Sequence, residues 1–240
     1  MNGQIHLIDL FRYYNRLSHQ TAAINELEEE INSIDPYILN RESQWYKTWA
    51  AAVAPKAGDW TITREQVAAI SGWKPQQFDD TFMNDLNMLV RVAGMKGLNQ
   101  RRHLIAQTCH ETGRYRWMQE IADGTAYEGR SDLGNTQEGD GPKFKGGGVI
   151  QLTGRYNYQR FSDWLERNGM SDDQVMELGA NYVANKYPFL SAVCWIEENQ
   201  WAEVCKTQDV YRVTRVLNGG YNGLEDRVHY YKKACEVIKS

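Results

Sequence analysis

The chain has 240 residues, enough for one mid-sized domain and a small additional module. Hydrophobic residues make up 42% and charged residues 24%, which is ordinary for a folded protein and argues against long disorder. The net charge is −4 without a block of Lys or Arg, and no apolar stretch approaches the length of a membrane span. We therefore expect neither nucleic-acid binding nor stable membrane insertion.

The first 57 residues predict a small helical module. Apolar residues recur at helical spacing over residues 4–15, residues 18–34 and a third segment from about residue 40. Residues 50–59 lose this period and gather Ala, Pro and Gly, so we place a domain boundary near residue 57. The aromatic residues of the third helix, Trp45, Tyr46 and Trp49, could bind a wall polymer, although docking on the main domain, residues 58–240, is the simpler interpretation.

The main domain is predicted to be mainly α. Thr63 with Gln66 is a capping pair that starts a helix, and Asn99 or a neighbour should cap another. Further helices are expected at about 78–93, 155–168, 173–186, 188–205, 207–217 and 224–239. The only strand candidates are short and lie near Phe144 and over Val149–Leu152.

The four cysteines are widely separated in the sequence. Without a C-x-x-C pair they indicate neither a zinc site nor a redox motif, so we expect reduced, mostly buried thiols. The first residues lack the basic segment and apolar run of a secretion signal. Synthesis in the cytosol without a secretion signal of its own is therefore expected.

Carboxylates between residues 101 and 158 suggest acid/base chemistry on a sugar. Hydrolysis of a glycosidic bond needs one protonated carboxyl and a second carboxylate. Glu111 ends an apolar helical run, where partial burial would favour the protonated acid. Two partners compete for the second role. Glu120 would lie on the opposite face if the helix continued, because nine residues turn about 900°.

Glu128 is the preferred base, because it follows a turn at residues 123–125 that can direct it back toward Glu111. Glu120 stays an alternative, since the helix could stop earlier. Taken by residue type alone, all three glutamates could be surface charges. His110, beside Glu111, has no histidine four residues away, so a metal site is not expected.

Four motifs in order resemble glycoside hydrolase family 19, and more closely its phage endolysin branch than plant chitinases. They are Cys109–Gly113 (CHETG), Tyr127–Arg130 (YEGR), Gly146–Tyr158 (GGGVIQLTGRYNY) and Asn218–Gly223 (NGGYNG). The resemblance covers about residues 61–240. It implies a lysozyme-like helical fold with a cleft between two lobes, a short β element and an inverting mechanism without metal or cofactor.

The resemblance also implies roles for individual residues. Glu111 matches the general acid and Glu128 the general base, and Thr153 matches a hydroxyl residue that helps to hold the attacking water. Substrate contacts are implied or expected at His110, Tyr127, Gln151, Asn157, Asn218 and Arg227, the last of which matches an arginine near the acid and base.

Two positions depart from the family pattern. Gly147 stands where an arginine is usual, so one substrate contact is missing or is supplied by Lys145 or Arg155. Tyr221 and Asn222 follow Asn-Gly-Gly where plant enzymes often have another acidic residue, which weakens the chitinase interpretation.

The sequence therefore predicts a phage-type endolysin that cuts the β-1,4 bonds of peptidoglycan. We expect it to act as a monomer and to stay in the host cytoplasm before release to the periplasm and cell wall. A chitinase on the same fold is the nearest alternative. A non-catalytic wall-binding or virion structural protein is the alternative from another class.

Overall fold

The computed structural model describes residues 61–168 and 172–239. They belong to the second of two units into which the chain divides, Trp60–Ser240. The predicted module 1–57, with its three helices and its aromatic residues, lies outside the described residues. Its role and the boundary near residue 57 therefore stay predictions.

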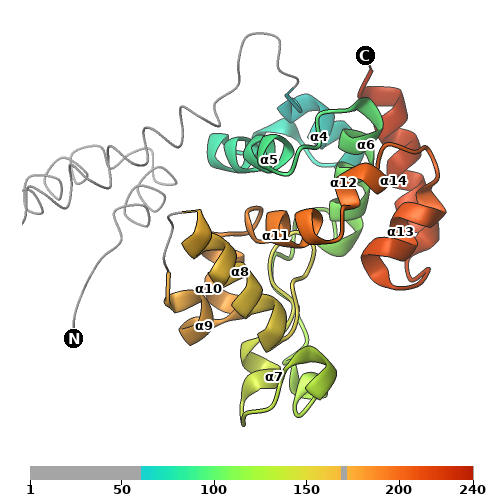
Figure 1. The fold of residues 1–240 in the computed structure, drawn as a ribbon. Helices are drawn as coiled ribbons and strands as arrows, with labels where there is room; N and C mark the ends of the chain where they lie inside the picture. Colours follow the sequence, from blue (N-terminus) through green and yellow to red (C-terminus); the bar gives the residue numbers. More distant parts are fainter. Residues whose placement is uncertain (1–60, 169–171, 240) are drawn as a thin grey trace, which may run out of the picture. The chain divides into compact units, whose positions relative to one another are not determined.

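The described residues are mainly helical, as predicted (Figure 1). The α-helices are α4 (Arg64–Ser71), α5 (Asp80–Val92), α6 (Leu98–Glu111), α7 (Asp140–Lys143), α8 (Arg155–Arg167), α9 (Gln174–Leu178), α10 (Ala180–Lys186), α11 (Ser191–Glu198), α12 (Trp201–Val204), α13 (Val210–Asn218) and α14 (Leu224–Val237). Short 3-10 helices cover Pro75–Gln77, Thr125–Tyr127 and Ser131–Leu133.

The helix starts show which capping predictions were right. Thr63 caps α4 as predicted, because its hydroxyl accepts from the Gln66 amide while the Gln66 side chain accepts from the Thr63 amide. The prediction for Asn99 was wrong. Gly97 is the N-cap of α6, and its amide donates to the Gln100 side chain at 2.6 Å.

Two predicted helices are each divided in two. Gly179 separates α9 from α10 with φ +63°, and a Cβ atom there would lie 2.1 Å from the Lys143 carbonyl oxygen. Position 179 therefore requires glycine, because a side chain there would collide with the Lys143 carbonyl. Gln200 separates α11 from α12 in the left-handed conformation, with φ +49°.

The predicted short β element is smaller than expected. Within the described ranges it consists of two isolated antiparallel bridges, Gln119 with Gly147 and Gly147 with Leu152. Phe144 is not in a strand, because it caps the C-terminus of α7.

The helices form two groups that meet at α11. In the first group α6 packs along α14 and also contacts α4 and α13. In the second, α8 and α10 both pack against α9. Helix α11 contacts α5 on one side and α8 on the other, and Figure 1 shows it between the two groups. Helix α11 also contacts α12, which packs against α13 of the first group, so α11 links the two groups.

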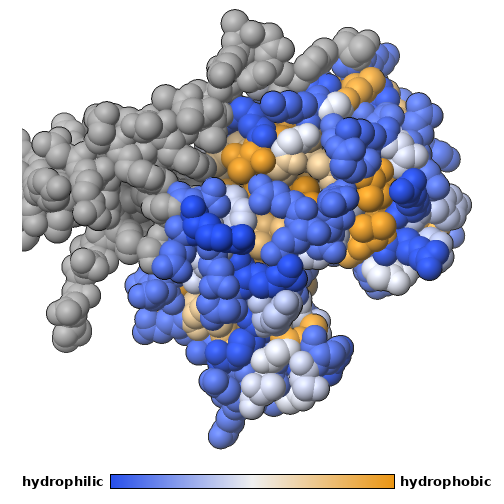
Figure 2. Space-filling view, in the orientation of Figure 1, coloured by the Kyte–Doolittle hydropathy of each residue, from blue (hydrophilic) through white to orange (hydrophobic). Residues whose placement is uncertain are grey.

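The surface is mostly hydrophilic, and the cysteines are unpaired and mostly buried. Figure 2 shows a mostly hydrophilic face with small hydrophobic areas between polar ones. None of the helices described is long and apolar enough to cross a membrane. The four cysteines are unpaired; three are buried and Cys235 is half-buried.

Candidate active site

Helix α6 ends at Glu111, and this removes the objection to Glu120. The Thr112 hydroxyl donates to the Thr108 carbonyl and accepts from the Tyr115 amide, so the chain turns back on the helix end. Arg114 and Tyr115 both have positive φ, 66° and 65°, which is uncommon for residues with a side chain. The objection to Glu120 assumed a helix that continues past Glu111. Because α6 ends at Glu111, that objection does not apply.

Glu111 is held by a buried arginine. Arg227 is completely buried in α14 and donates from Nη2 to Glu111 Oε1 at 2.5 Å. Its other donors reach Gln107 Oε1 at 2.5 Å and the Asn222 carbonyl at 3.2 Å. The resemblance thus located Arg227 correctly beside the proposed acid. The structure gives it a positioning role, since its side chain is only 1% exposed.

Gln107 is a partner that the sequence interpretation missed. It lies one helical turn before Glu111, so both side chains face the same neighbour on α14. Its amide nitrogen also donates to the Thr214 hydroxyl in α13 at 3.1 Å, which ties α6, α13 and α14 together below the carboxylate. The four-residue spacing from Glu111 was the available signal.

His110 is fixed by the start of α14. Its Nδ1 lies 2.7 Å from Asp226 Oδ2, and its ring occupies the space that a side chain at Gly223 would need. A Cβ atom at Gly223 would lie only 2.0 Å from the ring. This arrangement explains the glycine before α14 and favours a structural role for His110 over the substrate contact that was predicted.

Glu120 lies beside the β bridges and is half-buried. Its Oε1 accepts from the Tyr127 hydroxyl at 3.0 Å, and its Oε2 accepts from the Gly146 amide at 2.9 Å. A Cβ atom built at Gly146 would lie close to both Glu120 Oε2 and Gln151 Oε1, at 3.1 and 2.6 Å. The structure therefore brings Tyr127 and Gln151 to Glu120.

Glu128 is exposed, and both of its oxygens are bound by backbone. Oε1 accepts from the Gly139 amide and Oε2 from the Gly141 amide, each at 2.7 Å. These amides belong to the turn that starts α7. Glu128 thereby fastens this turn, and its hydrogen bonds resemble those of a structural carboxylate more than those of a free base.

The same turn is held from inside by a buried ion pair. Asp140 is 1% exposed and accepts two hydrogen bonds from Arg155, at 2.5 and 2.8 Å. The Arg155 guanidinium, helped by the amides of Gln137 and Thr136, holds the pKa of Asp140 below its ordinary value, although burial opposes this.

Gln151, Thr153 and Asn157 are linked in one chain of hydrogen bonds. Asn157 Nδ2 donates to the Thr153 carbonyl, and the Thr153 hydroxyl donates to the Gln151 carbonyl, both at 2.8 Å. Gln151 has φ +55°, a conformation that non-glycine residues seldom adopt. In the part of the chain that the structure describes, no hydrogen bond joins Thr153 to Glu120 or Glu128.

The Asn218–Gly223 loop connects α13 to α14. Asn218 is the exposed last residue of α13, and the Asn222 carbonyl holds Arg227. Tyr221 is 54% exposed and its ring centroid lies 6.3 Å from that of Tyr211. The loop therefore supports the arginine that anchors Glu111, and its exposed Tyr221 ring lies near the exposed Tyr211 ring of α13.

The structure accounts for glycine at position 147. A Cβ atom there would lie 2.6 Å from the Tyr158 hydroxyl, which donates to the Lys145 carbonyl at 2.8 Å. Neither proposed substitute for an arginine is free, because Lys145 Nζ donates to the Ala122 carbonyl and Arg155 is bound to Asp140. A family-type arginine would first require Tyr158 to move.

We expect Gly147→Ala to destabilise the domain by about 1–3 kcal/mol, because the added methyl group overpacks the buried Tyr158 hydroxyl. Urea unfolding measures the cost. The same change in a Tyr158→Phe background should cost clearly less, since the hydroxyl is then absent. If Gly147→Ala lowers the free energy of unfolding equally in both backgrounds, a contact other than the Tyr158 hydroxyl causes the destabilisation.

Comparisons with known proteins agree with this architecture. No protein-family model matches the chain. Over 121 residues it is 31% identical to a Haemophilus influenzae protein described as a glycosyl hydrolase family 19 domain-containing protein. The resemblance to family 19 is confirmed. The match covers 50% of this chain and 54% of the relative, so the chain spans about half the length of that relative.

Solved structures show a likeness in fold. Chitinase C from Streptomyces griseus HUT6037 superposes with a TM-score of 0.53 at 14% identity, over 74% of this chain and 92% of the chitinase. A mutant of chitinase C gives the same values. The predicted lysozyme-like helical fold is therefore confirmed.

Proposed function

We propose that this chain is a family 19 type glycosidase that hydrolyses the β-1,4 bonds of peptidoglycan, with an endolysin as its biological setting. The observation that carries the proposal is a pair of anchored carboxylates, Glu111 on Arg227 and Glu120 on Tyr127 and Gly146. Sequence similarity to a family 19 domain and the fold of a chitinase support it.

Glu111 is the proposed general acid. Of the two Glu111 oxygens, Arg227 donates to Oε1, and no described residue donates to Oε2. Oε2 is therefore the atom from which a proton would pass to the leaving glycosidic oxygen. The bond to Arg227 fixes the carboxyl group in orientation, which matters because proton donation requires a defined distance to the leaving oxygen.

Glu120 is the proposed general base, in place of the preferred Glu128. Each oxygen of Glu120 accepts a single hydrogen bond, which leaves lone pairs for a water molecule. Glu128 also accepts one hydrogen bond at each oxygen, but both donors are backbone amides of the α7 turn and the residue is exposed, whereas Glu120 is half-buried. Gln151, close to Glu120, is a candidate sugar contact, and Thr153 and Asn157 fix the backbone that carries it.

A second candidate, a chitinase, is favoured by the likeness to chitinase C. Reducing-end analysis of digests of purified peptidoglycan and of chitin separates the two. We expect reducing ends from peptidoglycan at a much higher rate than from chitin. Rapid cleavage of chitin with peptidoglycan left intact would favour the chitinase.

A further inference from the structure

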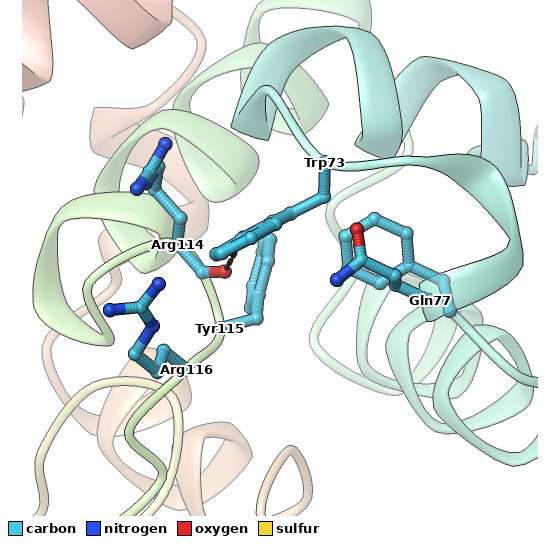
Figure 3. Close-up of a pocket in the computed structure, with 6 residues that line it drawn as sticks. Trp73, Gln77, Arg114, Tyr115 and Arg116 are labelled. Carbon is cyan, nitrogen blue, oxygen red and sulfur yellow. Dashed lines mark hydrogen bonds between the residues drawn. The ribbon is translucent and has the colours of Figure 1, made fainter.

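A pocket of about 210 Å³ lies beside the segment that directly follows Glu111. It is lined by Trp73, Gln77, Phe78, Arg114, Tyr115 and Arg116. Figure 3 shows the two arginines on one side of the pocket, Gln77 on the other, and Trp73 and Tyr115 between them. None of these residues belongs to the acid/base site described above.

Both guanidinium groups lie over one indole ring, that of Trp73. The Cζ atoms of Arg114 and Arg116 lie 4.8 and 5.1 Å from the Trp73 ring centroid. Trp73 is itself fixed, because its Nε1 donates to the Arg114 carbonyl at 2.8 Å. Stacking uses the face of a guanidinium and leaves its N–H edge available for a planar anion.

Tyr115 holds the two arginines in place. Its hydroxyl lies 2.9 Å from the Thr108 hydroxyl, and its ring packs edge-on against Phe78 and Phe82. Arg114 and Arg116 flank this half-buried anchor, so their backbone positions are set by its contacts with the core. Among residues 61–168 and 172–239, no carboxylate forms an ion pair with either arginine.

We propose that this pocket, here called the Arg114/Arg116 site, binds a carboxylate of the peptide stems of peptidoglycan. This inference rests on the proposed function and specifies its substrate class. The edge of a guanidinium matches a carboxylate in geometry and charge, and two such groups line this pocket. Chitin is an uncharged polymer and has no group for such a site. The chain carries a net charge of −4, so an acidic wall needs a local cationic contact of this kind.

The test compares native peptidoglycan with the same material whose carboxylates have been converted to methylamides. The wild-type protein should have a KM about tenfold lower on the native material, as expected for a charge-assisted contact. The Arg114→Gln/Arg116→Gln variant should lose this preference while keeping the wild-type rate on the amidated material. Arg167→Gln, an exposed arginine on α8, removes a charge elsewhere and should keep the preference.

Arg116→Gln alone covers the case in which the double variant does not fold, because Arg116 is exposed. Co-sedimentation of each protein with the two materials measures binding without turnover. If the wild type hydrolyses neither material but sediments with native peptidoglycan through its arginines, the glycosidase proposal fails and the site stands. If the Arg114/Arg116 variants keep the wild-type preference in both assays, the site is refuted.

Discussion

Glu120→Gln should reduce turnover on peptidoglycan by roughly 10²–10⁴-fold, whereas Glu128→Gln should retain it within about tenfold. Glutamine at position 120 can still accept from Tyr127 or Gly146, but it cannot take a proton from water. The two variants carry the same change in charge and size at positions eight residues apart, so each is the control for the other. Initial rates of reducing-end release at neutral pH provide the comparison.

Glu128→Gln should also have a measurable effect on stability. Glu128→Gln loses one of the two backbone hydrogen bonds at Gly139 and Gly141, so it should destabilise the α7 turn by about 1 kcal/mol. If Glu128→Gln abolishes turnover in a folded protein while Glu120→Gln does not, Glu128 is the base and the assignment made from geometry is wrong.

Arg227→Met should cost about 3–5 kcal/mol of folding free energy, because it leaves a partly buried carboxylate without its partner. The Gln107 side-chain oxygen and the Asn222 carbonyl also lose their donor. For a domain of this size the melting temperature should fall by roughly 10 °C. Thermal unfolding measures the effect.

A double-mutant cycle isolates the contact between Arg227 and Glu111. Glu111→Gln alone keeps a neutral acceptor for Arg227. In that background Arg227→Met should cost clearly less, since no charge is left unpaired. Arg227→Lys is the matched control that keeps the charge but lacks the fork that reaches Glu111 and Gln107 together. If the loss of folding free energy in the double variant equals the sum of the losses in Glu111→Gln and Arg227→Met, the anchoring role assigned to Arg227 is ruled out.

Local signals in the sequence predicted much of the fold. The Thr63–Gln66 capping box depends on residues three apart, and the apolar period of α6 located Glu111 at a helix end. The motif resemblance placed Arg227 beside Glu111 although the two are 116 residues apart. These features depend either on neighbouring residues or on a pattern that similar chains share.

The features that were missed depend on tertiary contacts. Gly179 interrupts the α9–α10 segment because the Lys143 carbonyl approaches it, and nothing near Gly179 in the sequence indicates that approach. The proposal of Glu120 over Glu128 as the base likewise rests on where α6 ends and on which amides reach Glu128, and it stays a prediction. Those amides lie 11 and 13 residues further along the chain.

The most direct test of the central claim is the release of reducing ends from purified peptidoglycan by the wild-type protein and by Glu111→Gln. With Glu111 as the general acid, the wild type should release them and the variant should be slower by roughly 10²–10⁴-fold, with binding to peptidoglycan unchanged. Equal release by the two proteins, or none by the wild type, would contradict the assignment of this chain as a glycosidase that acts through Glu111.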